Sequence, residues 1–145
     1  MESIRLKLLR EGARVPTYGS EQAAGADLYA CINQTVTIAP GESAWIPTGV
    51  AVEIPEGYVG LIYARSSMGA KRGLAPANKV GVIDSDYRGE LCVVLHNHSL
   101  LEQCVEPNER VAQLVITPVI TPGFCVVDEL TDTQRADKGF GSTGK

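Results

Sequence analysis

The densest group of side chains capable of chemistry lies between Gly81 and Glu90, where the sequence reads GVIDSDYRGE. Asp84 follows directly after two apolar residues, so its carboxylate is expected at the end of a strand. A carboxylate held at such a point can orient a water molecule and take a proton from it. An ordinary aspartate turn that closes a hairpin would have a similar sequence. The segment alone leaves both interpretations open.

A second candidate site is Arg65-Ser66-Ser67, which combines a guanidinium group with two hydroxyl groups. The planar fork of arginine matches the oxygens of a phosphate group. The alternative is a surface arginine followed by a serine that begins a short helix. These three residues therefore indicate a phosphate site without establishing one.

Two further places could bind a metal ion. Asp27 stands among small residues in the run from Ala24 to Leu28 (AGADL), where the backbone can be approached closely. Its carboxylate could be linked to a metal, and a plain loop aspartate is the alternative. His96 and His98 are predicted to share one face of a strand, but without a third ligand zinc binding is not favoured.

The last residues have a different composition from the rest. Phe140 is the only large apolar residue between Thr131 and Lys145. Such a segment cannot bury enough apolar surface to order itself, so we expect a flexible C-terminal arm over residues 131–145. Gly139 to Lys145 matches the pattern GxxxxGK, but a P-loop also needs a preceding strand and a following helix, and we do not expect one. Consecutive Gly, Ser and Thr residues can still offer N–H and hydroxyl groups to phosphate oxygens.

Residues 1–130 are predicted to form one all-β domain that positions these side chains. Apolar residues alternate with polar ones or form short runs, as is typical of strands. The 15 Gly and 8 Pro residues indicate many chain reversals. The best helical candidate is 66–72, and the expected architecture is a sandwich or a distorted barrel. The predicted strands cover residues 4–8, 36–38, 50–54, 58–63, 91–95 and 111–119.

Bulk composition limits the classes of function. The chain has 145 residues, 44% of them hydrophobic and 21% charged, which suits one globular domain. A net charge of −4 gives no global positive field, so no nucleic-acid partner is expected. No apolar run approaches the ~20 residues that span a membrane and no secretory leader is seen, so we expect no membrane partner and a cytoplasmic location. The four cysteines, without a CxxC pair, are expected to be reduced and buried.

Five segments, taken in order, resemble the motifs of the trimeric dUTP pyrophosphatases (dUTPases). The third and fifth segments are long and specific, and the five together span nearly the whole chain. The resemblance implies a distorted, jelly-roll-like β barrel that forms a three-fold trimer, with each active site built from three chains. The segments are Ala24–Ala30, Arg65–Ser67, Gly81–Glu90, Glu109–Gln113 and Arg135–Gly144.

The resemblance implies hydrolysis of dUTP to dUMP and pyrophosphate with Mg²⁺. This activity limits uracil incorporation into DNA and supplies dUMP for thymidylate synthesis. Asp84 would be the general base that orients a water molecule for attack on the α-phosphorus, and it would also accept a hydrogen bond from the sugar 3′-hydroxyl. Gln113 would help to position this water. Asp27 would touch magnesium through its water shell, because magnesium loses water reluctantly and favours phosphate ligands.

The resemblance also implies how the substrate is recognised. Asn78 and the backbone of Val82 and Ile83 would read the edge of the uracil ring. Tyr87 would pack beneath the deoxyribose and leave no room for a 2′-hydroxyl group. Phe140 from another chain would close over the uracil ring. The residues that would hold phosphate oxygens are Arg65, Ser66, Ser67, Arg135, Gly141 and Ser142.

Three positions depart from the motifs, which usually have glycine where this chain has Asn108, Ala136 and Lys138. Asn108 is expected to keep its turn, because asparagine tolerates the left-handed conformation. Ala136 and Lys138 leave less backbone freedom and are expected to slow closure of the arm, whereas the charge of Lys138 would add attraction for phosphate. Two other functions stay open: a dCTP deaminase on the same fold, and a non-catalytic trimer that binds dUTP. Release of pyrophosphate from dUTP would separate the main hypothesis from both.

Overall fold

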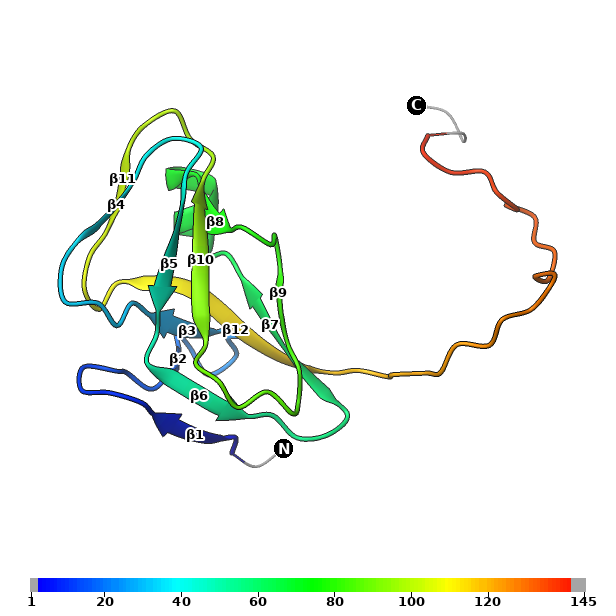
Figure 1. Cartoon of the computed structure of the whole chain (residues 1–145), viewed down its shortest axis with the longest axis horizontal. Helices are drawn as coiled ribbons and strands as arrows, with labels where there is room; N and C mark the ends of the chain where they lie inside the picture. Colours follow the sequence, from blue (N-terminus) through cyan, green and yellow to red (C-terminus); the bar gives the residue numbers. More distant parts are fainter. Residues whose placement is uncertain (1–2, 142–145) are drawn as a thin grey trace.

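The computed structural model describes residues 3–141. Twelve strands and one helical turn make up the regular structure of these residues, which confirms the prediction of an all-β domain (Figure 1). In chain order the elements are β1 (Arg5–Leu8), β2 (Thr17–Tyr18), β3 (Ala26–Tyr29), β4 (Val36–Ile38), β5 (Ser43–Pro47), β6 (Val50–Glu53), β7 (Tyr58–Tyr63), η1 (Ser67–Lys71), β8 (Leu74–Pro76), β9 (Gly81–Ile83), β10 (Cys92–Asn97), β11 (Gln103–Val105) and β12 (Arg110–Pro118).

All strand pairs are antiparallel, and they are divided among four sheets. The largest sheet has the order β2-β3-β12-β7-β9, and a second has the order β5-β10-β8. Two ladders of two strands, β1-β6 and β4-β11, complete the body. Alternation along β10 buries Val93 and Leu95, whereas Cys92 and Val94 face outward and are partly exposed. The buried side chains of both larger sheets belong to one hydrophobic cluster, which is the core of the domain.

The sequence-based boundaries agree closely with several elements. The strand predicted at 58–63 is β7, and the one predicted at 111–119 is β12 with a shift of one residue at each end. The helix predicted at 66–72 is a single π-helical turn, η1, with Arg72 as its C-cap. Gly73 follows with a φ of 66°, which only glycine adopts freely. Asn108 has a φ of 62°, so the prediction that it keeps a left-handed turn is confirmed.

The expectation that all four cysteines are buried is wrong. All four are free, but Cys104 and Cys125 are exposed, and Cys31 and Cys92 are only partly covered. Cys92 occupies an outward position in the alternation of β10, and Cys104 lies at the middle of the short strand β11 with its side chain outward. Strand alternation therefore outweighs the general tendency of cysteine to be buried.

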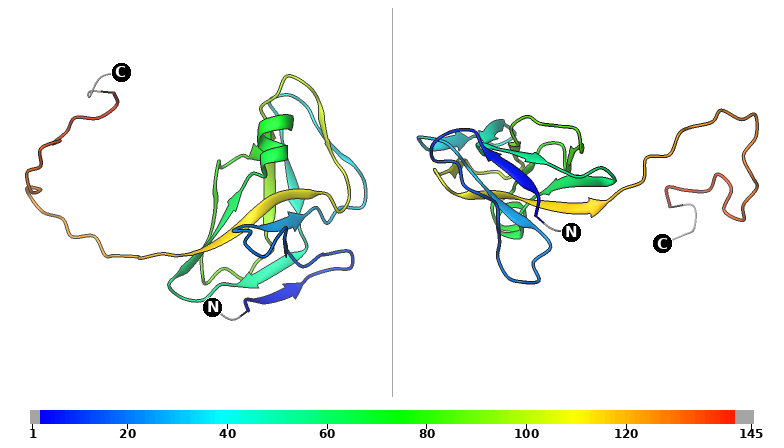
Figure 2. Two further views of the ribbon diagram at one scale, coloured as in Figure 1. Left: turned by 180° about the vertical axis from the view of Figure 1, so that it is seen from behind. Right: turned by 90° about the horizontal axis from the view of Figure 1, so that it is seen from below.

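The segment that follows β12 leaves the body of the protein. Residues 119–141 contain no strand or helix and extend away from the sheets, as the orange and red trace in Figures 1 and 2 shows. Its apolar residues Ile120, Phe124 and Val126 are 87%, 101% and 98% exposed. The boundary predicted at residue 130 lies inside this extended segment. Within the described part of the chain, no helix has the length and apolar character needed to cross a membrane.

Candidate active site

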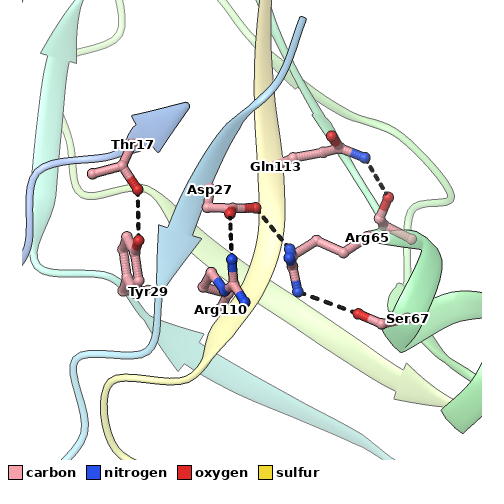
Figure 3. A network of polar contacts seen from close by, with 8 residues as sticks. Thr17, Asp27, Tyr29, Arg65, Ser67, Arg110 and Gln113 are labelled. Carbon is pink, nitrogen blue, oxygen red and sulfur yellow. Dashed lines mark hydrogen bonds and ion pairs between the residues drawn. The ribbon is translucent and has the colours of Figure 1, made fainter. Parts of the chain in front are cut away.

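Asp27 lies on β3 at the centre of a polar network (Figure 3). Its side chain is almost buried, and both carboxylate oxygens are paired with arginines. Arg65 Nε donates to Oδ1 over 2.7 Å, and Arg110 Nη1 donates to Oδ2 over 3.3 Å. A buried carboxylate needs such partners because an unpaired charge away from water is costly. Asp27 therefore fixes the direction of the Arg65 guanidinium.

Arg65 connects β7 to the π-helical turn. Its carbonyl oxygen accepts the backbone N–H groups of Met68 and Gly69 over 3.1 and 2.8 Å, and its Nη1 donates to Ser67 Oγ over 3.2 Å. Ser66 is exposed and its hydroxyl makes no capping hydrogen bond, so it is free to contact a ligand. Single π-helical turns are frequent at functional sites. The guanidinium of Arg65 is thus in contact with the Ser67 hydroxyl, and Ser66 stands between the two residues in the sequence.

Gln113 joins this group from β12. It faces Asp27 across one ladder and Tyr63 across the other, and its Nε2 donates to the carbonyl oxygen of Ala64 over 2.9 Å. The opposite end of the amide lies over Gly25, where a Cβ atom would be in steric conflict with Oε1. The glycine of the first motif therefore makes room for the glutamine of the fourth. We refer to these residues together as the arginine group: Asp27, Arg65, Ser67 and Gln113.

The second predicted group surrounds β9. A pocket of about 80 Å³ is lined by Asn78, Gly81, Val82 and Ile83. A Cβ atom on Gly81 would make an ordinary contact of 3.5 Å with Asn78 Nδ2 and a tight one of 3.2 Å with Ile62 Cβ, so the Asn78 amide lies beside this strand. The structure thus brings together Asn78, Val82 and Ile83, which were predicted to read the edge of the uracil ring.

Asp84 follows β9 and lines a larger, open groove of about 930 Å³. Tyr87 lies in the loop after it and is 44% exposed. The phenol oxygen of Tyr87 donates to the carbonyl oxygen of Glu90 over 3.0 Å, and its ring covers Gly89, where any Cβ atom would collide with it. We use the name carboxylate group for the set of residues around β9 and the loop that follows it: Asn78, Val82, Ile83, Asp84 and Tyr87.

The arginine group and the carboxylate group are separated within one chain. Along β7, Gln113 stands opposite Tyr63, whereas Ile83 stands opposite Gly60. Three positions along a strand correspond to about 10 Å, and Asp84 lies beyond Ile83. One chain therefore does not place its own Asp84 carboxylate beside its own Arg65.

The predicted residues of the arm are also apart from both groups. Arg135, Phe140 and Gly141 lie on the extended trace, and Phe140 is fully exposed. Arg135 Nε donates to the carbonyl oxygen of Lys138 over 2.9 Å, which closes a local turn. Ser142 lies outside the described residues.

Sequence reasoning missed three arginines. Arg110 pairs with Asp27, and Arg72 joins η1 to the turn before β12 by contacting Glu109 and the carbonyl oxygen of Cys104. Arg10 pairs with Glu90 over 2.6 Å, and this hydrogen bond raises the pKa of Arg10 above its ordinary value. The signal in the sequence was charge: the five motifs include Glu90, Glu109 and Arg110, whose charges could have pointed to these ion pairs.

The described residues contain no cluster of three or more His, Cys, Asp or Glu side chains that could hold a metal ion. Asp27 is the nearest carboxylate to the Arg65 side chain, and both of its oxygens are already paired with arginines. A dedicated protein cage for a divalent cation is therefore not formed by residues 3–141. A cation that arrives with a phosphate ligand and keeps most of its water fits these residues better.

The fold and these groups define a class: an all-β domain with a candidate phosphate site and a separate strand-end carboxylate. The family model described as dUTPase matches residues 11–144, and the chain belongs to this family. The family predicted from the five motifs is thereby confirmed.

Curated relatives match over nearly their full length. The deoxyuridine 5′-triphosphate nucleotidohydrolase of Janthinobacterium sp. (strain Marseille) is 45% identical, with 100% of this chain and 99% of that protein covered. The protein of the same name from Burkholderia cenocepacia (strain J2315) is 46% identical, with 97% of both covered.

Solved structures agree in fold. A dUTPase mutant of Staphylococcus bacteriophage 80alpha with dUpNHpp superposes with a TM-score of 0.91 at 34% identity, covering 100% of both chains. A mutant dUTPase from phage phi11 of S. aureus, described as coordinating a structural Mg(II) ion, gives 0.79 at 31% identity, covering 88% of this chain and 98% of that one. The predicted fold class is therefore confirmed at the level of the family.

Proposed function

We propose that this chain hydrolyses dUTP to dUMP and pyrophosphate in an active site that several subunits build together. The match to the dUTPase family across residues 11–144 carries this conclusion. The name of the full-length relatives, which are nucleotidohydrolases of deoxyuridine 5′-triphosphate, supports the same substrate. In the cell the reaction limits uracil incorporation into DNA and supplies dUMP for thymidylate synthesis.

The chemical step needs an activated water, and Asp84 is the candidate base. The carboxylate takes a proton from water while the water oxygen attacks the α-phosphorus. The bond from this phosphorus to the oxygen that bridges it to the β-phosphate then breaks, and pyrophosphate leaves. Gln113, held by the Ala64 carbonyl oxygen, positions the water. A positioned base contributes about 10²–10⁴ in rate.

Phosphate binding rests on the arginine group and on the arm. Arg65, directed by Asp27, donates to phosphate oxygens together with Ser66 and Ser67. Arg135, Gly141 and Ser142 of the arm clamp the β- and γ-phosphates. An arginine that neutralises charge in a phosphoryl-transfer transition state contributes about 10³–10⁵ in rate. These cations offset the net charge of −4, which would otherwise repel the substrate.

Base and sugar recognition rest on the carboxylate group. Asn78 and the backbone of Val82 and Ile83 line the small pocket, and they pair with the edge of uracil. A different base would leave those polar groups unpaired, which discriminates strongly. Tyr87 packs against the deoxyribose, and Asp84 accepts a hydrogen bond from the 3′-hydroxyl. Phe140 covers the uracil ring and excludes water from the closed site.

The assembly is a homotrimer in which each site takes the arginine group from one subunit, the carboxylate group from a second and the arm from a third. Two observations support this proposal: the two groups are about 10 Å apart along β7, and the arm extends away from its own body (Figure 2). The division into a domain of residues 1–130 and an arm of residues 131–145 belongs to the same proposal.

Magnesium is the proposed cofactor. Asp27 is the residue that would meet it, through coordinated water, beside phosphates held by Arg65. When bound, the ion would neutralise charge on the triphosphate. We propose a cytoplasmic enzyme without nucleic-acid or membrane partners, in keeping with its acidic composition.

A pyrophosphate-release assay with dUTP, UTP, dCTP and dTTP tests the proposal. We expect turnover of dUTP in the presence of Mg²⁺ and little turnover of the other three nucleotides. Ammonia release from dCTP with dUTP untouched would instead identify a deaminase. Tight binding of dUTP by a folded assembly without turnover would identify a binding protein.

A further inference from the structure

We propose that Arg10 and Glu90 are a positioning pair that sets the selectivity of the site for deoxyribose over ribose. The pair holds the end of the loop that contains Tyr87, at 2.6 Å from Arg10 Nη2 to Glu90 Oε2. This inference rests on the proposed function, in which the Tyr87 ring excludes a 2′-hydroxyl group.

Glu90 is anchored from two directions. Its Oε1 accepts the backbone N–H of Gly49 over 2.7 Å, and its Oε2 accepts Arg10 Nη2. Gly49 also accepts the backbone N–H of Leu9 over 2.8 Å, which fixes the chain beside Arg10. Gly49 has a φ of 71°, and a Cβ atom there would lie 2.6 Å from Ala13 Cβ. The carboxylate is therefore held by two elements of the N-terminal half of the chain.

The backbone of Glu90 in turn holds Tyr87. The phenol O–H of Tyr87 donates to the Glu90 carbonyl oxygen, and its ring lies over Gly89. The backbone N–H of Tyr87 donates to the Asp84 carbonyl oxygen over 3.2 Å. The loop has no strand or helix between Asp84 and Glu90, so side-chain contacts help to determine where the ring lies. Arg88 Nη1 donates to the carbonyl oxygens of Ser85 and Tyr87 over 2.6 and 3.0 Å, and the Leu91 N–H donates to the Val50 carbonyl oxygen over 2.8 Å. The Glu90 side chain adds the link to Arg10 and Gly49.

The charge of Arg10 matters because Glu90 is mostly covered. The Glu90 side chain is 20% exposed, whereas Arg10 is 43% exposed. An ion pair between two exposed side chains contributes little. Loss of Arg10 would instead leave a partly buried carboxylate with one partner, and the carboxylate would then move toward water. Movement of residue 90 would displace the carbonyl oxygen to which Tyr87 is bonded.

The chain contains a matched control. Arg5 Nη1 and Glu53 Oε2 form an ion pair of 3.2 Å between β1 and β6, with 83% and 41% exposure. Both residues line the groove that contains Asp84, so their substitution changes the charge near the loop in a similar way. Neither of them bonds to the loop.

The test compares kcat/KM for dUTP and for UTP in the full-length protein. Glu90→Gln keeps an acceptor for Gly49 but loses the charge, and Arg10→Gln keeps part of the stem. We expect each to lower the dUTP:UTP ratio by about tenfold, the scale of one altered packing contact in a pocket. Arg10→Lys should keep most of the ratio, and Arg5→Gln should keep all of it.

The outcomes separate this inference from the proposed function. An unchanged ratio in Arg10→Gln and Glu90→Gln, with a lowered ratio in Tyr87→Ala, would overturn the positioning pair and leave the Tyr87 contact standing. An unchanged ratio in Tyr87→Ala would overturn both the positioning pair and the exclusion of ribose by Tyr87. Equal losses on both substrates, together with a lower Tm, would show that the pair is only structural. Arg10 is well exposed, so Arg10→Gln remains informative if Glu90→Gln fails to fold.

Discussion

The side-chain amide of Gln113 on β12 fills the space where a side chain on residue 25 would begin, so it is in direct contact with Gly25, which lies just before β3. The contact fixes the amide from one side, and the Ala64 carbonyl oxygen fixes it from the other. A residue predicted to position water is thus itself positioned by a glycine.

We therefore expect Gly25→Ala to lower kcat for dUTP by about 10²-fold, because a displacement near 1 Å at a reacting group has that effect. Steady-state kinetics and a thermal unfolding curve would measure it. Gly19→Ala is the matched control, since a Cβ atom on Gly19 meets nothing within 4 Å. Equal kcat values for the two variants would contradict the role of the contact.

Substitution of Asp84 tests the proposed base. Asp84→Asn keeps the shape of the side chain but cannot take a proton from water, so kcat should fall by about 10²–10⁴. Affinity for a non-hydrolysable dUTP analogue, measured by calorimetry, should change little. Asp86→Asn in the same groove is the control. Unchanged turnover in Asp84→Asn would remove Asp84 from the mechanism.

Substitution of Asp27 tests the buried ion pairs. Asp27→Asn leaves Arg65 and Arg110 without a charged acceptor, and the free energy of unfolding should fall by about 1–3 kcal/mol. KM for dUTP should rise at the same time, because the direction of Arg65 is lost. Urea unfolding at a fixed protein concentration and steady-state kinetics would measure the two effects. A rise in KM without any loss of stability would show that Asp27 acts on substrate rather than on Arg65.

The turn in the arm offers a gain-of-function test. Ala136 has a φ of 47°, a conformation that costs a residue with a Cβ atom about 1–2 kcal/mol. If only the bound arm has this turn, Ala136→Gly should lower KM for dUTP by about 5- to 30-fold, since about 1.4 kcal/mol is tenfold. Ala136→Ser keeps the Cβ atom and should show no gain. If KM is unchanged in Ala136→Gly, residue 136 does not keep this strained conformation when the arm is closed over substrate.

Truncation after Thr133 tests the arm as a whole. Turnover should be lost, because Arg135 and the residues that follow it are absent, while the assembly should keep its size. Size-exclusion chromatography with light scattering would report the size, and pyrophosphate release would report the activity. A truncated protein that dissociates into monomers would show that the arm holds the assembly together.

Local patterns were enough for some features and not for others. The apolar run from Tyr58 to Tyr63 identifies β7 because strands of this kind are visible within six consecutive residues. The tolerance of asparagine for positive φ was enough to predict the turn at Asn108. Both features depend on residues that are neighbours in the sequence.

Contacts between distant residues could not be predicted in the same way. The Arg10–Glu90 pair joins residues 80 positions apart, and the Arg110–Asp27 pair joins residues 83 apart. The separation of Asp84 from Arg65 within one chain depends on the register of β9 against β7, which no short pattern encodes. The site residues could therefore be identified by type, and the resemblance to the family implied that each site is divided among chains. The register of β9 against β7 supplies the physical reason why one chain keeps the two groups apart.

The distance between those two groups has a genetic consequence. A chain that lacks a working Asp84 still carries an intact Arg65, and a chain that lacks Arg65 still carries Asp84. In the proposed assembly, when both defective forms are made in one cell and assemble together, some sites would receive their guanidinium from the first form and their carboxylate from the second. Two alleles that are inactive alone can then complement each other, which would not occur if every site were contained in one subunit.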